Sequence, residues 1–123
     1  IHSRVRFLGR MDAQGVAACM QSADILCLPS ANEGVPNVIL EAFACGIPVV
    51  ASDVGGISEV LTSNALGRLV PSGDTAALAN ALEEVVSGPG TREEILRHSE
   101  RFTWDRTADA YHRHLVTARH HSR

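Results

Sequence analysis

The 123-residue sequence contains no lysine, and all eleven of its basic residues are arginines. The net charge is −3 and no basic run interleaved with aromatic residues is present, which argues against a general nucleic-acid-binding surface. No apolar run approaches the roughly 20 residues that a membrane-spanning helix needs, and the first residues lack the pattern of a signal peptide. A hydrophobic content of 45% with 20% charged residues therefore indicates one ordinary globular domain.

Cysteine is scarce and odd in number. Cys19, Cys27 and Cys45 lie in apolar stretches without the paired spacing of a metal site, so we expect buried, reduced thiols in a cytoplasmic protein. His112 and His114 are two residues apart and point in different directions on a helix, so we expect a solvated helix end there, not a metal site.

Short apolar runs alternate with helical patterns along the chain. The expected strands are Val5–Leu8, Ile25–Leu28, Val49–Ala51 and Arg68–Val70, and the continuous apolar run of the second suits a strand buried on both faces. Strands that alternate with helices imply right-handed crossovers and a parallel sheet. We therefore expect a three-layer α/β unit with its ligands at the carboxyl ends of the strands.

The helices are predicted from apolar periodicity and from capping residues. They are Asp12–Ser22 with Asp12 as N-cap, Pro36–Gly46, Ile57–Leu61, a helix from Asp74 or Thr75 to Val86, Thr91–His98 and Trp104–Ala118. Leu78, Leu82, Val85 and Val86 are expected on one face of the fourth helix, and Trp104 and Tyr111 are expected to anchor the last helix in the core.

The most informative segment is Pro29–Ala42. It places Glu33 and Glu41 eight residues apart, across a turn that runs into an apolar helix. Pro36 suits the first turn of a helix, and Gly34 allows another group to approach the backbone closely. The free N–H groups that follow favour a phosphate, and the carboxylates can accept hydrogen bonds from hydroxyls. This chemistry suits a sugar nucleotide.

This segment and the downstream Ala44–Val60 resemble the donor-binding domain of the retaining glycosyltransferases of family 4, the group 1 glycosyl transferases. The hallmark is Glu-x7-Glu, then Ala-x-Gly-x-Pro-Val-Val-Ala and Gly-Gly-x-x-Glu. The resemblance continues upstream in Val5–Gly9 and Ser22–Ser30, and downstream from Gly67–Asp74 to Phe102–Trp104. It implies the C-terminal, Rossmann-like half of a GT-B fold, as a single partial nucleotide-sugar-binding domain over 1–123 with C-terminal helices at about 91–121.

The resemblance also implies roles for individual residues. Glu41 would hold the ribose hydroxyls, and Glu33, the candidate catalytic residue, would lie near the donor sugar as a nucleophile or as an electrostatic and binding group. Contacts through backbone groups to the sugar and diphosphate are implied for Gly34, Val35, Pro36, Asn37 and Val38, although Pro36 has no N–H to give and Asn37 is alternatively a local helix-start residue.

Two further sites are open to more than one interpretation. Arg10 and Met11 follow the first expected strand, where the family reads the nucleobase edge, but Arg10 is alternatively a surface arginine. Gly55, Gly56 and Glu59 match the Gly-Gly-x-x-Glu turn, for which we favour a structural role over ligand contact.

The family's reaction uses no metal, and its co-substrate is a nucleotide sugar such as a UDP- or GDP-sugar. The acceptor, a glycan, lipid or small molecule, binds to an N-terminal domain that this sequence lacks, and any peripheral membrane contact is expected only through that domain. The Arg and Lys pair that neutralises the diphosphate is also missing. Because the chain opens with Ile1, we expect a fragment. Because the acceptor domain and the cation pair are missing, we expect this chain alone to bind the donor weakly and to transfer nothing.

A different class of function stays open. The chain is alternatively a non-catalytic α/β module that binds a nucleotide or a partner protein, and a native start close to Ile1 would favour this interpretation. A phosphoacceptor receiver domain is set aside because that fold needs a lysine, and this sequence has none.

Overall fold

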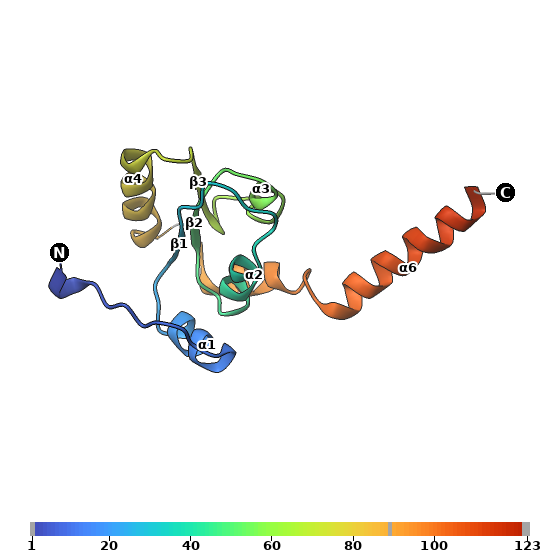
Figure 1. The fold of residues 1–123 in the computed structure, drawn as a ribbon, viewed down its shortest axis with the longest axis horizontal. Helices are drawn as coiled ribbons and strands as arrows, with labels where there is room; N and C mark the ends of the chain where they lie inside the picture. Colours follow the sequence, from blue (N-terminus) through green and yellow to red (C-terminus); the bar gives the residue numbers. More distant parts are fainter. Residues whose placement is uncertain (1, 89, 122–123) are drawn as a thin grey trace.

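The computed structural model describes residues 2–88 and 90–121. Three parallel strands form one sheet in the order β1-β2-β3 (Figure 1): Leu26–Leu28, Val49–Ser52 and Gly67–Val70. In register, Leu26 lies beside Val49, and Val49 lies beside Gly67. The helices are η1 (His2–Arg4, a 3-10 turn), α1 (Ala13–Gln21), α2 (Asn37–Ala44), α3 (Ile57–Val60), α4 (Thr75–Val86), α5 (Arg92–Ser99) and α6 (Trp104–His121).

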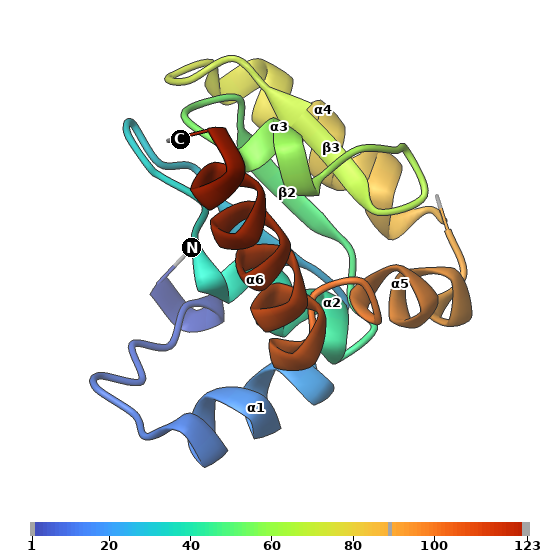
Figure 2. The same cartoon turned by 90° about the vertical axis from the view of Figure 1, so that its right-hand side faces the viewer.

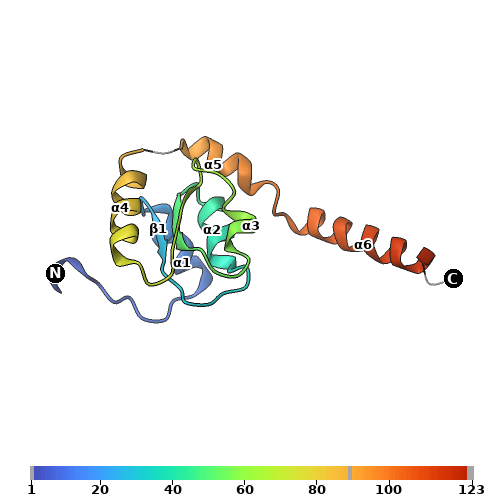
Figure 3. The ribbon, with the colours of Figure 1, turned by 90° about the horizontal axis from the view of Figure 1, so that it is seen from above.

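The sheet lies between two helical layers, as the sequence predicts. Helix α4 covers one face, and α2 and α3 lie on the other, with α5 packed beside α2 (Figures 1 and 3). The side chains of the fully buried strand β2 pack against both helical layers, since successive side chains of a strand point to opposite faces. Val49 and Ala51 pack with α2 and α3, whereas Val50 packs with Val70 and Val85 on the α4 side. The three-layer α/β fold is therefore confirmed.

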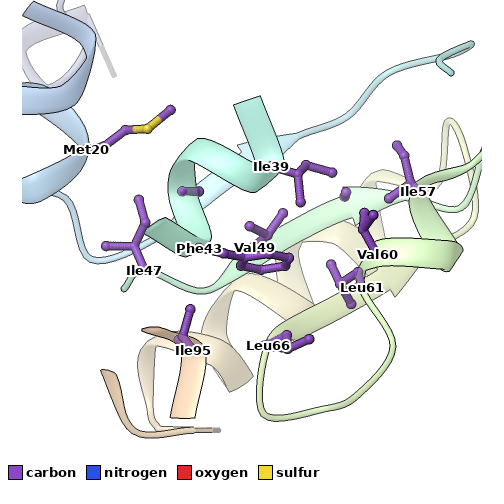
Figure 4. Packing of buried hydrophobic residues seen from close by; sticks show 12 residues of the cluster. Met20, Ile39, Phe43, Ile47, Val49, Ile57, Val60, Leu61, Leu66 and Ile95 are labelled. Atoms are coloured by element: carbon purple, nitrogen blue, oxygen red, sulfur yellow. The ribbon is translucent and has the colours of Figure 1, made fainter. Parts of the chain in front are cut away.

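Figure 4 shows the larger core cluster, to which α1, α2, β2, α3 and α5 all contribute. Phe43 of α2 lies at its centre and is fully buried, beside Val49 of β2 and Leu61. Met20 ties α1 to this cluster, and Ile95 ties α5 to it. The core thus fixes α2, the helix that follows the Glu33 loop.

Local signals set most helix boundaries. The Asp12 carboxylate accepts a hydrogen bond from the N–H of Gly15 at 2.8 Å, and the Asp74 carboxylate accepts one from Ala77 at 2.9 Å. Thr91 and Glu94 form a reciprocal capping box at the start of α5. Helix α2 begins one residue later than predicted, because Pro36 is its N-cap with an extended ψ of 125°.

The strand predicted at Val5–Leu8 is wrong. These residues form no regular element, and Phe7 is 96% exposed. A strand needs a hydrogen-bonded neighbour, and within residues 2–88 and 90–121 the sheet consists of β1, β2 and β3 alone. The segment has the apolar pattern of a strand, but none of the described strands pairs with it.

The predicted burial of β1 on both faces is also wrong. Leu26 and Leu28 are half-buried against the α2 layer, but Cys27 on the other face is exposed. Helix α4 packs mainly over β2 and β3, and on that face of the predicted run Ile25 is the residue that is partly buried, against the cluster of Val50 and Val85. Cys19 is exposed on α1 and Cys45 is half-buried, so the thiols are free but not buried as predicted.

Two other predicted core positions face solvent. Val86, in the last turn of α4, is 66% exposed, whereas Ala81 and Val85 are the residues of this helix that are buried. Trp104 is 89% exposed, and the side chain of Tyr111 lies outside the described residues. Helix α6 projects away from the sheet and its helices (Figures 1 and 3), and in Figure 2 it points toward the viewer, so Trp104 at its start does not pack into the core around the sheet.

None of the described helices is long and apolar enough to cross a membrane.

His98 joins α5 to α2 and α3. Its ring meets Phe43 edge-on at 5.5 Å between centroids and Phe102 at 5.4 Å. Its Nε2 lies 3.1 Å from the carbonyl oxygen of Val60, which only accepts, so this nitrogen carries the proton. Burial, opposed by the Val60 carbonyl, holds the pKa of His98 below its ordinary value of 6.5, and the positive charge of Arg101 adds to the lowering.

Acidification is therefore expected to destabilise the protein through His98. Since the pKa is lower in the folded state than in the unfolded one, stability is complete above pH 6.5 and is lost as the pH falls from there through the folded pKa. Urea unfolding at a series of pH values measures the effect, and His98→Gln should flatten it in this range. The exposed His112→Gln is the matched control, and an equal flattening in that variant would contradict the assignment.

Candidate functional site

The Glu33 loop connects β1 to α2 at the carboxyl edge of the sheet. Glu33 is half-buried, and the Ser30 hydroxyl donates a hydrogen bond of 2.8 Å to its Oε1. The carbonyl oxygen of Ser30 in turn accepts a hydrogen bond of 3.3 Å from the Ser72 hydroxyl, on the loop that follows β3. The carboxylate is therefore held by its own loop, and that loop is tied to a second strand end.

The Gly55–Gly56 turn follows β2 and packs directly on the Glu33 loop. The N–H of Gly56 donates a hydrogen bond of 2.9 Å to the carbonyl oxygen of Gly34. Gly55 has a left-handed φ of +55°, and a Cβ placed there would overlap the carbonyl oxygen of Glu33. The sequence predicts that these motifs meet at one rim of the sheet, and this hydrogen bond confirms it. The two glycines also have a structural role, because they let the turn approach the Glu33 loop closely.

The amino end of α2 lies directly beyond the loop. Its N-cap, Pro36, offers no side-chain hydrogen bond, so in this part of the structure no side chain caps the first N–H groups of the helix. Asn37 is exposed at the first helical position, and Val38 packs partly against the core. Val35 is 44% exposed. An uncapped helix start of this kind favours an anion through its N–H groups and its dipole.

An apolar cavity of about 460 Å³ lies between α1 and α2. Glu41 and Met11 both line it, although they are 30 residues apart in sequence. The rest of its wall is almost entirely apolar: Ala13, Val16, Ala17, Met20, Ala44 and Cys45. One carboxylate in an apolar wall is the composition of a small-molecule site, where few polar groups fix the orientation of the ligand.

The predicted site residues therefore form two groups on α2 and its loop. Glu33, Gly34, Val35, Pro36, Asn37 and Val38 lie at the loop and the start of α2, whereas Met11 and Glu41 line the cavity. Arg10 is exposed in the segment before α1 and is not among the residues that line the cavity.

Sequence reasoning missed Ser30 and Ser72, and the α1 side of the cavity. Ser30 stands three residues before Glu33, a spacing typical of a side-chain hydrogen bond within a turn, so its role was detectable. The apolar spacing of Val16 and Met20 on α1 was visible as well, but it does not distinguish a cavity wall from an ordinary core face.

The chain is similar in sequence to known proteins of one family. Residues 1–88 match the family model described as "Glycosyl transferases group 1". The chain is 47% identical over 90 residues to a phosphatidyl-myo-inositol mannosyltransferase of Mycobacterium leprae. This match covers 72% of the chain and 24% of the relative. It is 39% identical over 107 residues to a D-inositol 3-phosphate glycosyltransferase of Kribbella flavida, which covers 84% of the chain and 25% of the relative.

Two solved structures share the fold. Sucrose-phosphate synthase from Thermosynechococcus elongatus superposes with a TM-score of 0.81 at 31% identity, over 94% of this chain and 31% of the other. The lipopolysaccharide outer core galactosyltransferase WaaB in its apo form gives a TM-score of 0.84 at 27% identity, over 94% and 34%. Both are GT-B glycosyltransferases, so the fold is that of part of a GT-B enzyme. The chain belongs to the group 1 glycosyltransferase family and spans about a quarter of the length of the curated relatives it matches.

Proposed function

We propose that this chain is the donor-binding part of a retaining glycosyltransferase. The complete protein would transfer a sugar from a nucleoside diphosphate sugar to a hydroxyl of a glycan, lipid or small molecule, without a metal. Retention of the anomeric configuration and the use of a nucleotide sugar rest on the resemblance of the Glu33–Glu41 segment to the family motif. The three free thiols suit a reducing, cytoplasmic setting.

The observation that carries the proposal is the arrangement along α2. Glu41 lines the apolar cavity, and the start of the helix at Asn37 lies four residues away, or about 6 Å along the axis. The base, ribose and phosphates of a nucleoside diphosphate follow one another in the same order as the cavity, Glu41 and the start of α2. Its base would enter the cavity, its ribose diol would bond to the Glu41 carboxylate, and its phosphates would face the N–H groups of Asn37 and Val38.

In this arrangement Glu33 lies on the sugar side of the phosphates. We assign it to binding and charge stabilisation, because its carboxylate is already engaged by Ser30 and an ionised carboxylate stabilises positive charge that develops on a sugar ring.

Binding of UDP, GDP and ADP, measured by calorimetry, tests the proposal. We expect the chain to bind at least one of them weakly, with Kd on the order of 1 mM. Glu41→Gln should weaken binding at least about tenfold, since it replaces an acceptor for two hydroxyls with a neutral amide. Glu83→Gln on α4, the helix on the opposite face of the sheet, is the matched control. Equal affinity of these two variants, or no binding of any of the three nucleotides, would refute the proposal.

A further inference from the structure

Three loops meet at the carboxyl edge of the sheet and bond to one another around Glu33. They follow β1, β2 and β3, and they carry Ser30, the Gly55–Gly56 turn and Ser72 respectively. Residues distant in sequence therefore contact the backbone of the loop that carries Glu33, and the proposed function places the carboxylate of Glu33 next to the donor sugar.

The side chain of Glu33 has one hydrogen-bond donor on its own loop. The Ser30 hydroxyl lies 2.8 Å from Oε1, the short distance of a hydrogen bond to a charged acceptor. This bond leaves the second carboxylate oxygen, Oε2, without a donor that the structure describes. It therefore fixes the rotamer of Glu33 while one oxygen stays available to a ligand.

The backbone of the Glu33 loop is fixed by close contact instead. Only glycine fits at Gly55, because a Cβ there would overlap the carbonyl oxygen of Glu33 itself. At Gly56 a Cβ would lie 2.6 Å from Cγ2 of Val35. The Gly56 N–H to Gly34 carbonyl bond of 2.9 Å can form only at this approach.

We propose that Ser30, Gly55 and Gly56 are positioning residues that hold the Glu33 carboxylate at the donor end of α2. Ser30 fixes the rotamer of the Glu33 side chain through its hydrogen bond. The two glycines fix the position of the Glu33 loop by allowing it to pack directly on the Gly55–Gly56 turn. The inference rests on the proposed function, because it assigns these residues to the same site. It adds residues that would act through Glu33 and need not touch the ligand.

The first test uses NMR of the full-length protein labelled at the glutamate carboxyl carbons, with Glu33→Gln to identify the Glu33 resonance. Ser30→Ala is expected to shift that resonance, and Ser30→Thr, which keeps the hydroxyl, should leave it close to its original position. Ser87→Ala is the control, since the Ser87 hydroxyl donates to the Glu83 carbonyl at the end of α4, on the opposite face of the sheet. An unmoved Glu33 resonance in Ser30→Ala would overturn the role of Ser30.

The second test concerns the glycine turn. Gly55→Ala should speed hydrogen exchange of the Gly56 amide at least about tenfold, because the added methyl group pushes the Glu33 loop away and breaks the bond to Gly34. Gly73→Ala is the matched control, since Gly73 has a left-handed φ of +80° with open space around a Cβ. Equal exchange of the Gly56 amide in both variants would overturn the role of Gly55.

Kinetics separate this inference from the proposed function. With the sugar nucleotide that the full-length protein uses, Ser30→Ala should lower kcat about tenfold and leave KM within about twofold, with activity restored in Ser30→Thr. A shifted Glu33 resonance with an unchanged kcat would overturn the positioning role. If the unchanged protein turns over no sugar nucleotide, the proposed function fails instead, and the NMR and exchange results still decide whether these residues hold Glu33.

Discussion

Phe43→Ala is expected to lower the free energy of unfolding by about 3–5 kcal/mol, the range for truncating a buried phenylalanine. Phe43 is fully buried at the centre of the larger core cluster, where it joins α2 to β2 and meets the His98 ring of α5. A domain of this size has roughly 5–15 kcal/mol in total, so the loss would take a large share of its stability. Urea unfolding followed by circular dichroism measures it.

Phe102→Ala provides a matched control. Phe102 also meets the His98 ring, at 5.4 Å, but it is 37% exposed beyond the end of α5. Its loss should cost no more than about 1 kcal/mol, since exposed positions leave little cavity behind. Equal destabilisation by the two substitutions would mean that the ring contact, and not the burial of Phe43 under the sheet, determines the stability of this region.

Helix boundaries were the most predictable part of the fold, because their signals are local. The caps at Asp12 and Asp74 satisfy N–H groups three residues away, which the sequence displays directly. Gly46, with a φ of +70°, likewise follows the end of α2. The failures are non-local. The segment Val5–Leu8 has the pattern of a strand, but a strand needs a neighbour. Trp104 has the pattern of a core residue, but it is exposed at the start of α6, which projects away from the sheet.

The exposure of Cys27 shows the same limit on a smaller scale. Its apolar run indicates a strand buried on both faces, and the strand does form. What the sequence does not display is the position of α4, which packs mainly over β2 and β3. Burial of an edge strand depends on the lateral placement of a helix, and that placement is decided by packing between segments far apart in the chain.

The candidate site divides in the same way. The rim shared by Glu33, Gly34, Gly55 and Gly56 was predictable, since the carboxyl ends of parallel strands meet at one edge of a sheet. The partnership between Glu41 and the α1 wall was not, because it depends on how α1 packs against α2. The resemblance to the family supplied the roles proposed for these residues, and the structure shows where they lie and what they contact.

Gly67→Ala is expected to destabilise the protein by about 4 kcal/mol or more, which puts it among the rare severe substitutions. Gly67 opens β3 with a φ of +140°, and a Cβ there would overlap the carbonyl oxygen of Val49 on the neighbouring strand. The Val49 carbonyl belongs to β2, the central strand, which is paired on both sides, so it cannot move aside without disturbing the sheet, and no rotamer change relieves the clash. The register of β2 and β3 thus depends on a residue without a side chain at this position.

Gly88→Ala separates this clash from ordinary backbone strain. Gly88 has a comparable φ of +113°, but a Cβ there meets nothing within 4 Å, so its substitution should cost only about 1–2 kcal/mol. Urea unfolding of the two variants side by side gives the difference. Similar values would mean that the Val49 carbonyl does not lie against Gly67, and the β2–β3 register of the sheet would then have to be revised. A much larger loss in Gly67→Ala would support the pairing of β2 with β3 by experiment. That pairing helps to bring Ser72 to Ser30 at the carboxyl edge of the sheet.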